Sequence, residues 1–222
     1  MSTFPHIGIL GVGRVGSALA RVALAAGLQV TVAGSGAAER IALITEVMVP
    51  GAVASDAAGV VAAGDVVVLA VPLHRFDSID PALLDGKVVV DVMNYWEPID
   101  GHQPRFADAG TSSSEVVAAH FAGARIVKTF NHVGYHEVEL WGRPEGDPER
   151  QALGVASDDA AARELVAGVV DRMGFTPVDL GALANGRVLE PGGPFFGARH
   201  TEAEFRALLD AAGTAAGSQF PS

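Results

Sequence analysis

Three glycines near the start of the chain have a spacing that suits a dinucleotide. Gly11, Gly13 and Gly16 form the pattern G-x-G-x-x-G within the stretch GVGRVG. The first glycine permits a tight turn, the second lets the backbone approach a pyrophosphate, and the third lets a helix pack closely on a strand. The pyrophosphate is expected at the helix N-terminus, where unpaired N–H groups and the helix dipole favour an anion.

The stretch VTVAGSGAAER, about 20 residues beyond this turn, indicates which dinucleotide binds. An NAD site is expected to place a carboxylate here to hold the ribose hydroxyls. Instead, Ser35 can hydrogen-bond a phosphate oxygen, Gly36 leaves space for one, and Arg40 supplies positive charge. We therefore predict NADP. Glu39 leaves NAD open as an alternative, because its carboxylate could turn toward a ribose.

Side chains that supply protons in alcohol or keto-acid chemistry are hard to find. Neither tyrosine is followed by a lysine at the fourth position, where Ile99 follows Tyr95 and Glu139 follows Tyr135. Direct hydride transfer between two stacked flat rings needs no such group, because the cofactors supply the chemistry and the protein supplies position. The sequence therefore favours an oxidoreductase that moves hydride.

His132 and His136 are four residues apart, with Glu137 adjacent. On a helix this spacing can hold a metal, but Gly134 interrupts the segment and an expected strand precedes it. We predict no metal site. Asn131 and His132 are instead expected to line a site for a flat ring or to belong to an ordinary polar loop.

Strands that alternate with helices must position these residues. Buried strands are predicted from apolar runs at 6–10, 28–33, 65–71, 87–93 and 125–130, and a last strand–helix–strand unit covers 151–156, 158–173 and 175–180. A polar loop is expected over 94–110, followed by a capping box at 112–115. The alternation implies an α/β fold with a doubly wound parallel sheet, the Rossmann fold. We divide it into an NADP-binding domain, 1–145, and a small C-terminal α/β extension, 146–222, that completes the acceptor site.

Composition narrows the class of protein further. The chain has 222 residues, of which 49% are hydrophobic, and a formal net charge of −11. Nucleic acid and anionic membranes are disfavoured as partners, because binding phosphate groups requires clustered Lys and Arg. The absence of cysteine fits a reducing compartment. No signal peptide or membrane-spanning run is evident, so we expect a soluble cytoplasmic protein.

Motifs spread over nearly the whole chain together resemble one known family. They are GVGRVGSALA, VVLAVP, LDGKVVVDVMN, SSSEVVAA, ARIVKTFNHV, GFTPVDLGAL and GRVLEP. In order and spacing they resemble the NADPH-dependent reductases of coenzyme F420, an 8-hydroxy-5-deazaflavin. The resemblance implies hydride transfer between NADPH and a small-molecule acceptor of this kind, and a homodimer.

The resemblance also implies which residues form the site. It places cofactor contacts at Gly11, Val12, Gly13, Arg14, Val15, Gly16, Ser35, Gly36, Arg40, Ala70, Val71 and Pro72. The candidates for a wall of the ring site are Pro72, Asn94, Asn131 and His132. An anionic deazaflavin tail would need cations, which we expect to gather from Arg75, Lys128, Arg187 and Arg199.

Two departures from the family pattern leave the acceptor open. Gly36 stands where the family usually has a basic residue, and Tyr95 and Trp96 add bulk where the family often reads D-x-T-N-P. One alternative is an NADPH-dependent reductase of a flavin, a ferric complex or a small carbonyl. Another is a non-enzymatic protein that senses NADP.

Overall fold

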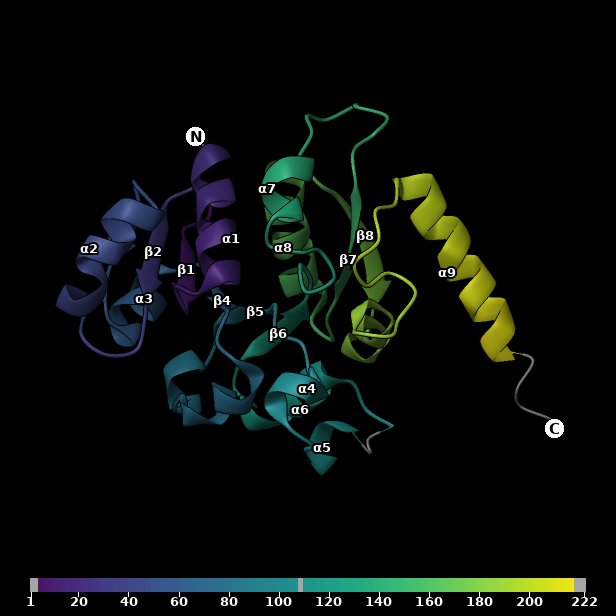
Figure 1. Ribbon diagram of the computed structural model, residues 1–222. Coiled ribbons are helices and arrows are strands. Elements are labelled where there is room, and N and C mark those ends of the chain that lie inside the picture. Colours follow the sequence, from purple (N-terminus) through teal and green to yellow (C-terminus); the bar gives the residue numbers. More distant parts are fainter. Residues whose placement is uncertain (1–3, 108–109, 218–222) are drawn as a thin grey trace.

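Among the residues that the structure describes, 4–107 and 110–217, eight strands form one sheet through the whole molecule. The structure is a computed structural model. The strands are β1 (Ile7–Leu10), β2 (Val30–Ala33), β3 (Val53–Ala54), β4 (Val66–Leu69), β5 (Val88–Asp91), β6 (Arg125–Lys128), β7 (Ala152–Ala156) and β8 (Thr176–Gly181). Their order across the sheet is β3-β2-β1-β4-β5-β6-β7-β8 (Figure 1). All neighbouring strands are parallel except β6 and β7, which confirms the predicted doubly wound Rossmann sheet.

The central strands are buried on both faces, which explains their uninterrupted apolar sequences. Alternate side chains of β4 enter different cores: Val66 and Val68 lie on one face, Val67 and Leu69 on the other. The first face is covered by α1 (Arg14–Ala25), α7 (Glu137–Trp141) and α8 (Ala160–Arg172). The second is covered by α3 (Ala57–Ala63), α6 (Ser113–His120) and the 3-10 turns η1 (Leu73–Ser78) and η2 (Pro81–Leu84).

The C-terminal part extends the same sheet. The predicted strand–helix–strand unit is present as β7, α8 and β8, and it joins β6 through the pair Lys128 and Ala156. The 3-10 turn η3 (Leu183–Leu189) and the helix α9 (Glu202–Gly217) cover the outer face, where Phe205 stacks on Phe195. Figure 1 shows α9 and α2 (Ala38–Met48) at opposite ends of the molecule. The division between 145 and 146 stays a prediction.

One segment differs from expectation. The predicted polar loop over 94–110 contains two short helices, α4 (Glu97–Asp100) and α5 (Pro104–Ala107). The first forms because the carboxylate of Asp100 accepts a hydrogen bond from the backbone N–H of Trp96, at 2.8 Å, and closes the turn. The capping box predicted just beyond this segment is confirmed, since Ser112 and Glu115 bond reciprocally at the start of α6.

Candidate functional site

The glycine-rich turn joins β1 to α1 and has the geometry that the spacing predicts. Gly11 has a φ of +116°, and a Cβ there would lie 2.4 Å from the carbonyl oxygen of Ala70. A Cβ at Gly16 would lie 1.9 Å from the carbonyl oxygen of Gly11. A Cβ at Gly13 would meet nothing within 4 Å. Gly11 and Gly16 are therefore required by packing, whereas Gly13 borders open space that fits a pyrophosphate.

A cleft of about 440 Å³ lies beside this turn, at the carboxyl ends of β1, β2 and β4. Its lining brings together predicted cofactor residues from all three strands: Gly11, Val12, Gly13, Ser35, Ala70, Val71 and Pro72. Arg75, Ser78 and Ile79 of η1 line it as well. We call this the nucleotide cleft, since ligands of open α/β sheets bind at the carboxyl ends of the strands.

The residues predicted to hold a 2′-phosphate lie at the end of β2. Ser35, Gly36 and Arg40 are all exposed, and Gly36 has a φ of +102°. A Cβ at Gly36 would lie 3.7 Å from Nη1 of Arg40, so the guanidinium stands beside the backbone of this turn. Arg14, at the start of α1, lies over the ring of Tyr135 with its Cζ 5.8 Å from the ring centre.

A second cleft of about 260 Å³ adjoins the first and shares Ala70, Val71 and Pro72 with it. We call it the ring cleft. Val15, Asn94, Trp96 and Ile99 complete most of its lining, and 77% of Ile99 is exposed. Among the residues that the structure describes, its only titratable lining residue is Asp100, which already pairs with Nδ1 of His74 at 3.0 Å. The ring cleft thus offers apolar walls and one amide, and no free acid or base.

Asn94 is held from behind by Asn131. The Nδ2 of Asn94 donates to the carbonyl of Asn131 at 2.7 Å, and the Nδ2 of Asn131 donates to Oδ1 of Asn94 at 3.0 Å. Asn131 also donates to the carbonyl of Leu189 at 2.7 Å and is buried. The turn that brings it there follows Phe130, whose φ of +59° is uncommon for a residue other than glycine. Asn131 therefore orients the amide of Asn94.

His132 is buried away from both clefts. The backbone N–H of Gly154 donates to its Nε2 at 3.3 Å, and its ring packs edge-on against Phe205. Burial above all, and then the nearby Lys128 and His200, lower the pKa of His132 from 6.5 to about 3. The side chain is therefore neutral, and it belongs to the packing between β7 and α9 rather than to the lining of the ring cleft.

A buried ion pair supports the floor of the ring cleft. Nζ of Lys128 lies 3.2 Å from Oδ2 of Asp91, with neither side chain exposed, and donates to the carbonyl of Met93 at 2.6 Å. Ser114 donates to the same carboxylate oxygen at 2.6 Å, and the N–H of Met93 donates to Oδ1 at 2.9 Å. We call Asp91, Lys128, Ser114 and Met93 the buried polar cluster. Because Met93 lines the ring cleft, the cluster fixes that wall.

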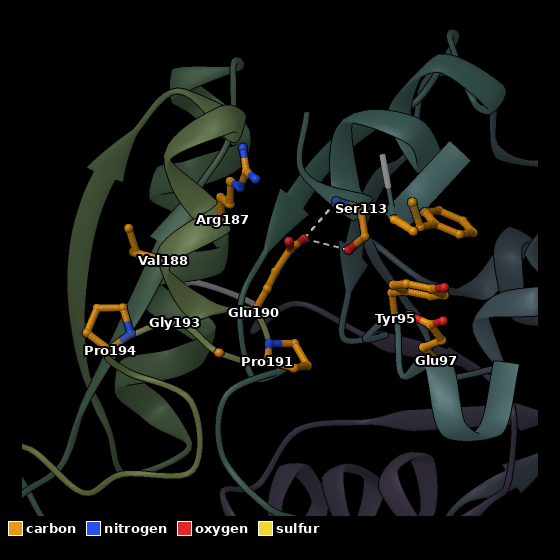
Figure 2. Close-up of a pocket in the computed structure, with 12 residues that line it drawn as sticks. Tyr95, Glu97, Ser113, Arg187, Val188, Glu190, Pro191, Gly193 and Pro194 are labelled. Atoms are coloured by element: carbon orange, nitrogen blue, oxygen red, sulfur yellow. Dashed lines mark hydrogen bonds between the residues drawn. The ribbon is translucent and has the colours of Figure 1, made fainter. Parts of the chain in front are cut away.

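A third cavity, of about 580 Å³, lies between Tyr95 and the segment after η3 (Figure 2). Figure 2 shows the carboxylate of Glu190 directed at Ser113, whose N–H and Oγ donate to it at 2.7 and 2.6 Å. This contact ties the C-terminal part to the start of α6, where the helix dipole favours a negative charge. Arg187 also lines the cavity.

The expected gathering of four cations around an acceptor tail is wrong. Arg187 lines the third cavity, but Arg75 lines the nucleotide cleft and Lys128 is buried in the polar cluster. Arg199 donates to the carbonyl of Glu149 at 2.8 Å. Lys128 was expected near an acceptor tail, and the structure instead buries it against Asp91. Its register with Asp91, the last residue of the neighbouring strand, is the signal that reveals the ion pair.

Residues 4–107 and 110–217 contain no group of three or more His, Asp or Glu side chains arranged to hold a metal ion. They also contain no helix that is long and apolar enough to cross a membrane.

Comparisons of the sequence with known proteins find reductases. Residues 6–95 match the family described as NADP oxidoreductase, coenzyme F420-dependent. The metalloreductase STEAP3 of Rattus norvegicus is 30% identical over 188 residues, which are 84% of this chain and 36% of that protein. The metalloreductase STEAP2 of Homo sapiens is 32% identical over 108 residues, 49% of this chain and 20% of that protein. The chain therefore spans at most 36% of the length of these curated relatives.

Solved structures share the fold over most of both chains. A hypothetical protein, SMa0349 of Sinorhizobium meliloti, has a TM-score of 0.77 and 28% identity, covering 90% of this chain and 97% of that one. A candidate F420-dependent NADP reductase of Arthrobacter sp. FB24 has a TM-score of 0.68 and 24% identity, covering 89% and 100%. At that identity the second match shows the fold alone.

The glycine-rich turn and the nucleotide cleft define the class of protein as a nucleotide-binding protein on a Rossmann fold. Within that class, the resemblance to the coenzyme F420-dependent NADP oxidoreductases is confirmed over residues 6–95, which include the turn and the strands that carry the nucleotide cleft.

Proposed function

We propose that the protein transfers hydride between NADPH and a flat-ring acceptor, with the deazaflavin coenzyme F420 as that acceptor. The observation that carries the proposal is the shared wall of the two clefts, Ala70 to Pro72. A nicotinamide that extends along this wall from the nucleotide cleft would face the ring cleft. NADPH supplies a hydride and becomes NADP⁺, and the acceptor gains two electrons and takes a further proton from water.

The residues of this chain act by position in the proposed reaction. The turn at Gly13 would hold the pyrophosphate, and Val71 and Pro72 would exclude water beside the two rings. Asn94, oriented by Asn131, would hydrogen-bond a polar ring atom. Because hydride moves directly from ring to ring, no side chain has to take a proton, which agrees with the engaged state of Asp100.

The alternative acceptors are a flavin or a ferric complex. The relatives named metalloreductases favour them, because the similarity to rat STEAP3 extends over 84% of this chain. The scattered cations favour them too, because a polyanionic tail would meet Arg187 together with the carboxylates of Glu97 and Glu190 in the third cavity. The family match and the motifs along the chain favour the deazaflavin.

Turnover of NADPH with a panel of acceptors tests these proposals. The purified protein is mixed with NADPH and, separately, with coenzyme F420, free flavin mononucleotide and ferric citrate, and loss of NADPH absorbance is followed. We expect the fastest loss with F420. Faster loss with flavin or ferric citrate would establish the alternative, and NADPH binding without any turnover would support the sensor.

A matched pair of variants tests the ring cleft. Asn94→Ala should lower kcat/KM about tenfold, because the acceptor ring loses its orienting amide, while NADPH affinity stays unchanged. Asn185 is a suitable control, since its amide also donates to a carbonyl, that of Leu180, but lies on η3 outside the ring cleft. Equal activity of Asn94→Ala and Asn185→Ala would remove Asn94 from the site.

We also propose a cytoplasmic homodimer, on the family resemblance alone. Light scattering of the purified protein at several concentrations tests the dimer. A molar mass near that of one 22.7 kDa chain would reject it.

A further inference from the structure

Two arginine side chains differ from all other cations of the protein. The chain has 15 lysines and arginines, and all of them lie in the described ranges. Thirteen have a hydrogen bond, an ion pair or a ring contact there, such as Arg105 with Asp77 or Arg14 with Tyr135. The side chains of Arg40 and Arg75 have none among residues 4–107 and 110–217. A guanidinium group left free in a chain of net charge −11 is available to an anionic ligand.

One free arginine lines the nucleotide cleft, and the other lies beside the turn that follows its lining residue Ser35. Arg40 lies beside Gly36 at the end of β2, and Arg75 lines the cleft from η1. The backbone that carries Arg75 is fixed: its N–H donates to the carbonyl of Pro72 at 2.8 Å, and its carbonyl accepts from Oγ of Ser78 at 2.7 Å. The free guanidinium is therefore presented by a rigid turn.

The acidic side chains near Arg75 in sequence are engaged elsewhere. Asp77 pairs with Arg105 at 3.1 Å, and Asp80 accepts from the N–H of Ala82 at 3.0 Å. Asp100, which lies against η1 through His74, is held by that histidine and by Trp96. These carboxylates are therefore paired with other groups, and the charge of Arg75 stays uncompensated beside the nucleotide cleft.

We propose that Arg75 binds the 2′-phosphate of NADPH together with Arg40, so that the phosphate lies between two guanidinium groups from different elements. This inference rests on the proposed function and adds a specificity-determining residue to it. A phosphate monoester carries a charge of about −1.5 to −2 at neutral pH. Gly36 contributes no side chain to neutralise it, so the end of β2 supplies only Ser35 and Arg40. The planar guanidinium of Arg75 suits the remaining oxygens.

Calorimetric titration of NADPH and NADH, without acceptor, tests this assignment. Arg75→Ala should weaken NADPH binding about tenfold or more and leave NADH binding unchanged, since NADH has no 2′-phosphate. Arg40→Ala should behave in the same way. Added salt should weaken NADPH binding less in Arg75→Ala than in the wild type, because one screened charge pair is gone.

Arg125→Ala is the matched control. It removes an exposed arginine from the first position of β6, at the sheet edge opposite the clefts, where Arg125 donates to the carbonyl of Gly86. It should leave both affinities unchanged. An equal loss of NADPH and NADH affinity in Arg75→Ala would show that the guanidinium stacks on the adenine, and no loss would remove it from the site. Either result overturns the proposal.

The experiment separates this inference from the proposed function. A wild-type protein that prefers NADPH, and loses the preference in Arg75→Ala, supports the inference even if no acceptor is reduced. Turnover of NADPH with unchanged preference in Arg75→Ala would retain the enzyme and reject the role of Arg75. A wild-type protein that binds NADH as tightly as NADPH would overturn the inference directly.

Discussion

The nucleotide cleft and the buried polar cluster lie at the same edge of the sheet and are built in opposite ways. The nucleotide cleft is shaped by backbone, with glycines at its turn. The side chains of Arg75, in its lining, and of Arg40, beside Gly36, have no partner among the described residues. In the polar cluster, Asp91 accepts three hydrogen bonds and Lys128 donates two, with no exposure to solvent. The nucleotide cleft therefore keeps its cations and N–H groups for a ligand, whereas the polar groups of the cluster bond to one another.

The difference teaches how the proposed reaction divides its tasks. A site that binds an anion needs unpaired N–H groups and free cations until the ligand arrives. A site that positions a ring needs walls that do not move, and a buried network of hydrogen bonds supplies such walls. Met93 connects the polar cluster to the ring cleft, since it belongs to the cluster and lines that cleft together with Pro72, which also lines the nucleotide cleft.

The largest expected effect comes from breaking the polar cluster. Lys128→Met would leave the carboxylate of Asp91 buried without its cation, which should lower the free energy of unfolding by about 3–5 kcal/mol. The double variant Lys128→Met with Asp91→Asn removes both charges and should lose clearly less. Equilibrium unfolding in urea measures both losses.

Equal losses in the single and double variants would contradict this account, because they would show that an unpaired carboxylate at Asp91 costs no stability. Lys87→Met is the control for removing a lysine near a sheet edge. Its Nζ donates to the carbonyl of Gly64 at 3.1 Å and has no carboxylate partner within residues 4–107 and 110–217, so its removal leaves no buried charge there.

Two glycines of one turn sharpen the comparison within the nucleotide cleft. Gly16→Ala forces a methyl group against the carbonyl of Gly11 and should reduce the free energy of unfolding by about 1–3 kcal/mol. Gly13→Ala projects its methyl group into open space and should change stability by no more than about 0.5 kcal/mol. Its NADPH affinity should nevertheless fall about tenfold, because the methyl group occupies the expected pyrophosphate site.

Urea unfolding and NADPH titration of both variants separate the two roles. A Gly13→Ala protein that binds NADPH normally would show that the open space beside Gly13 is not where the pyrophosphate lies. A Gly16→Ala protein of unchanged stability would show that α1 can shift away from β1 without loss.

The sequence predicts the elements of the fold well and their side-chain partners less well. Continuous apolar runs predict every central strand to within a few residues, because parallel strands are buried on both faces. The glycine spacing predicts the turn, since packing requires glycine at positions 11 and 16, and Gly13 borders open space. The antiparallel entry of β7 and the helices α4 and α5 were missed, because they depend on contacts between distant segments and on one aspartate at a turn.

The same distinction between local patterns and distant contacts applies to the residues of the candidate site. Seven lining residues of the nucleotide cleft, 11–13, Ser35 and 70–72, were predicted as cofactor contacts, whereas Arg75, Ser78 and Ile79 of η1 were not. Lys128 and His132 were placed wrongly from the sequence. Pairing between strands sets the surroundings of Lys128, and the turn at Phe130 sets those of His132. No local sequence pattern predicts the positive φ of that turn. Asn131 was named as a wall of the ring site, and the structure gives it a place behind Asn94 instead.

The prediction with the smallest effect on stability at neutral pH concerns His132, and this effect grows as the pH falls. In the unfolded chain this histidine takes up a proton as the pH falls through 6.5, whereas burial in the folded protein holds its pKa at about 3. Between these values the unfolded state binds more protons, so acid favours unfolding. The contribution of His132 to stability should fall by about 1.4 kcal/mol for each pH unit below 6.5, down to about pH 3.

Unfolding in urea at a series of pH values, for the wild type and His132→Gln, measures this slope. The variant is expected to lose stability less steeply below pH 6.5, whatever its stability at neutral pH, because no buried imidazole then resists protonation. His136→Gln removes an exposed histidine from the same loop and should keep the wild-type slope. If His132→Gln keeps that slope as well, the imidazole is reached by solvent in the folded state. The packing between β7 and α9, which adjoins Lys128 of the polar cluster, would then admit water, and the interior beside that cluster would not be closed as the comparison requires.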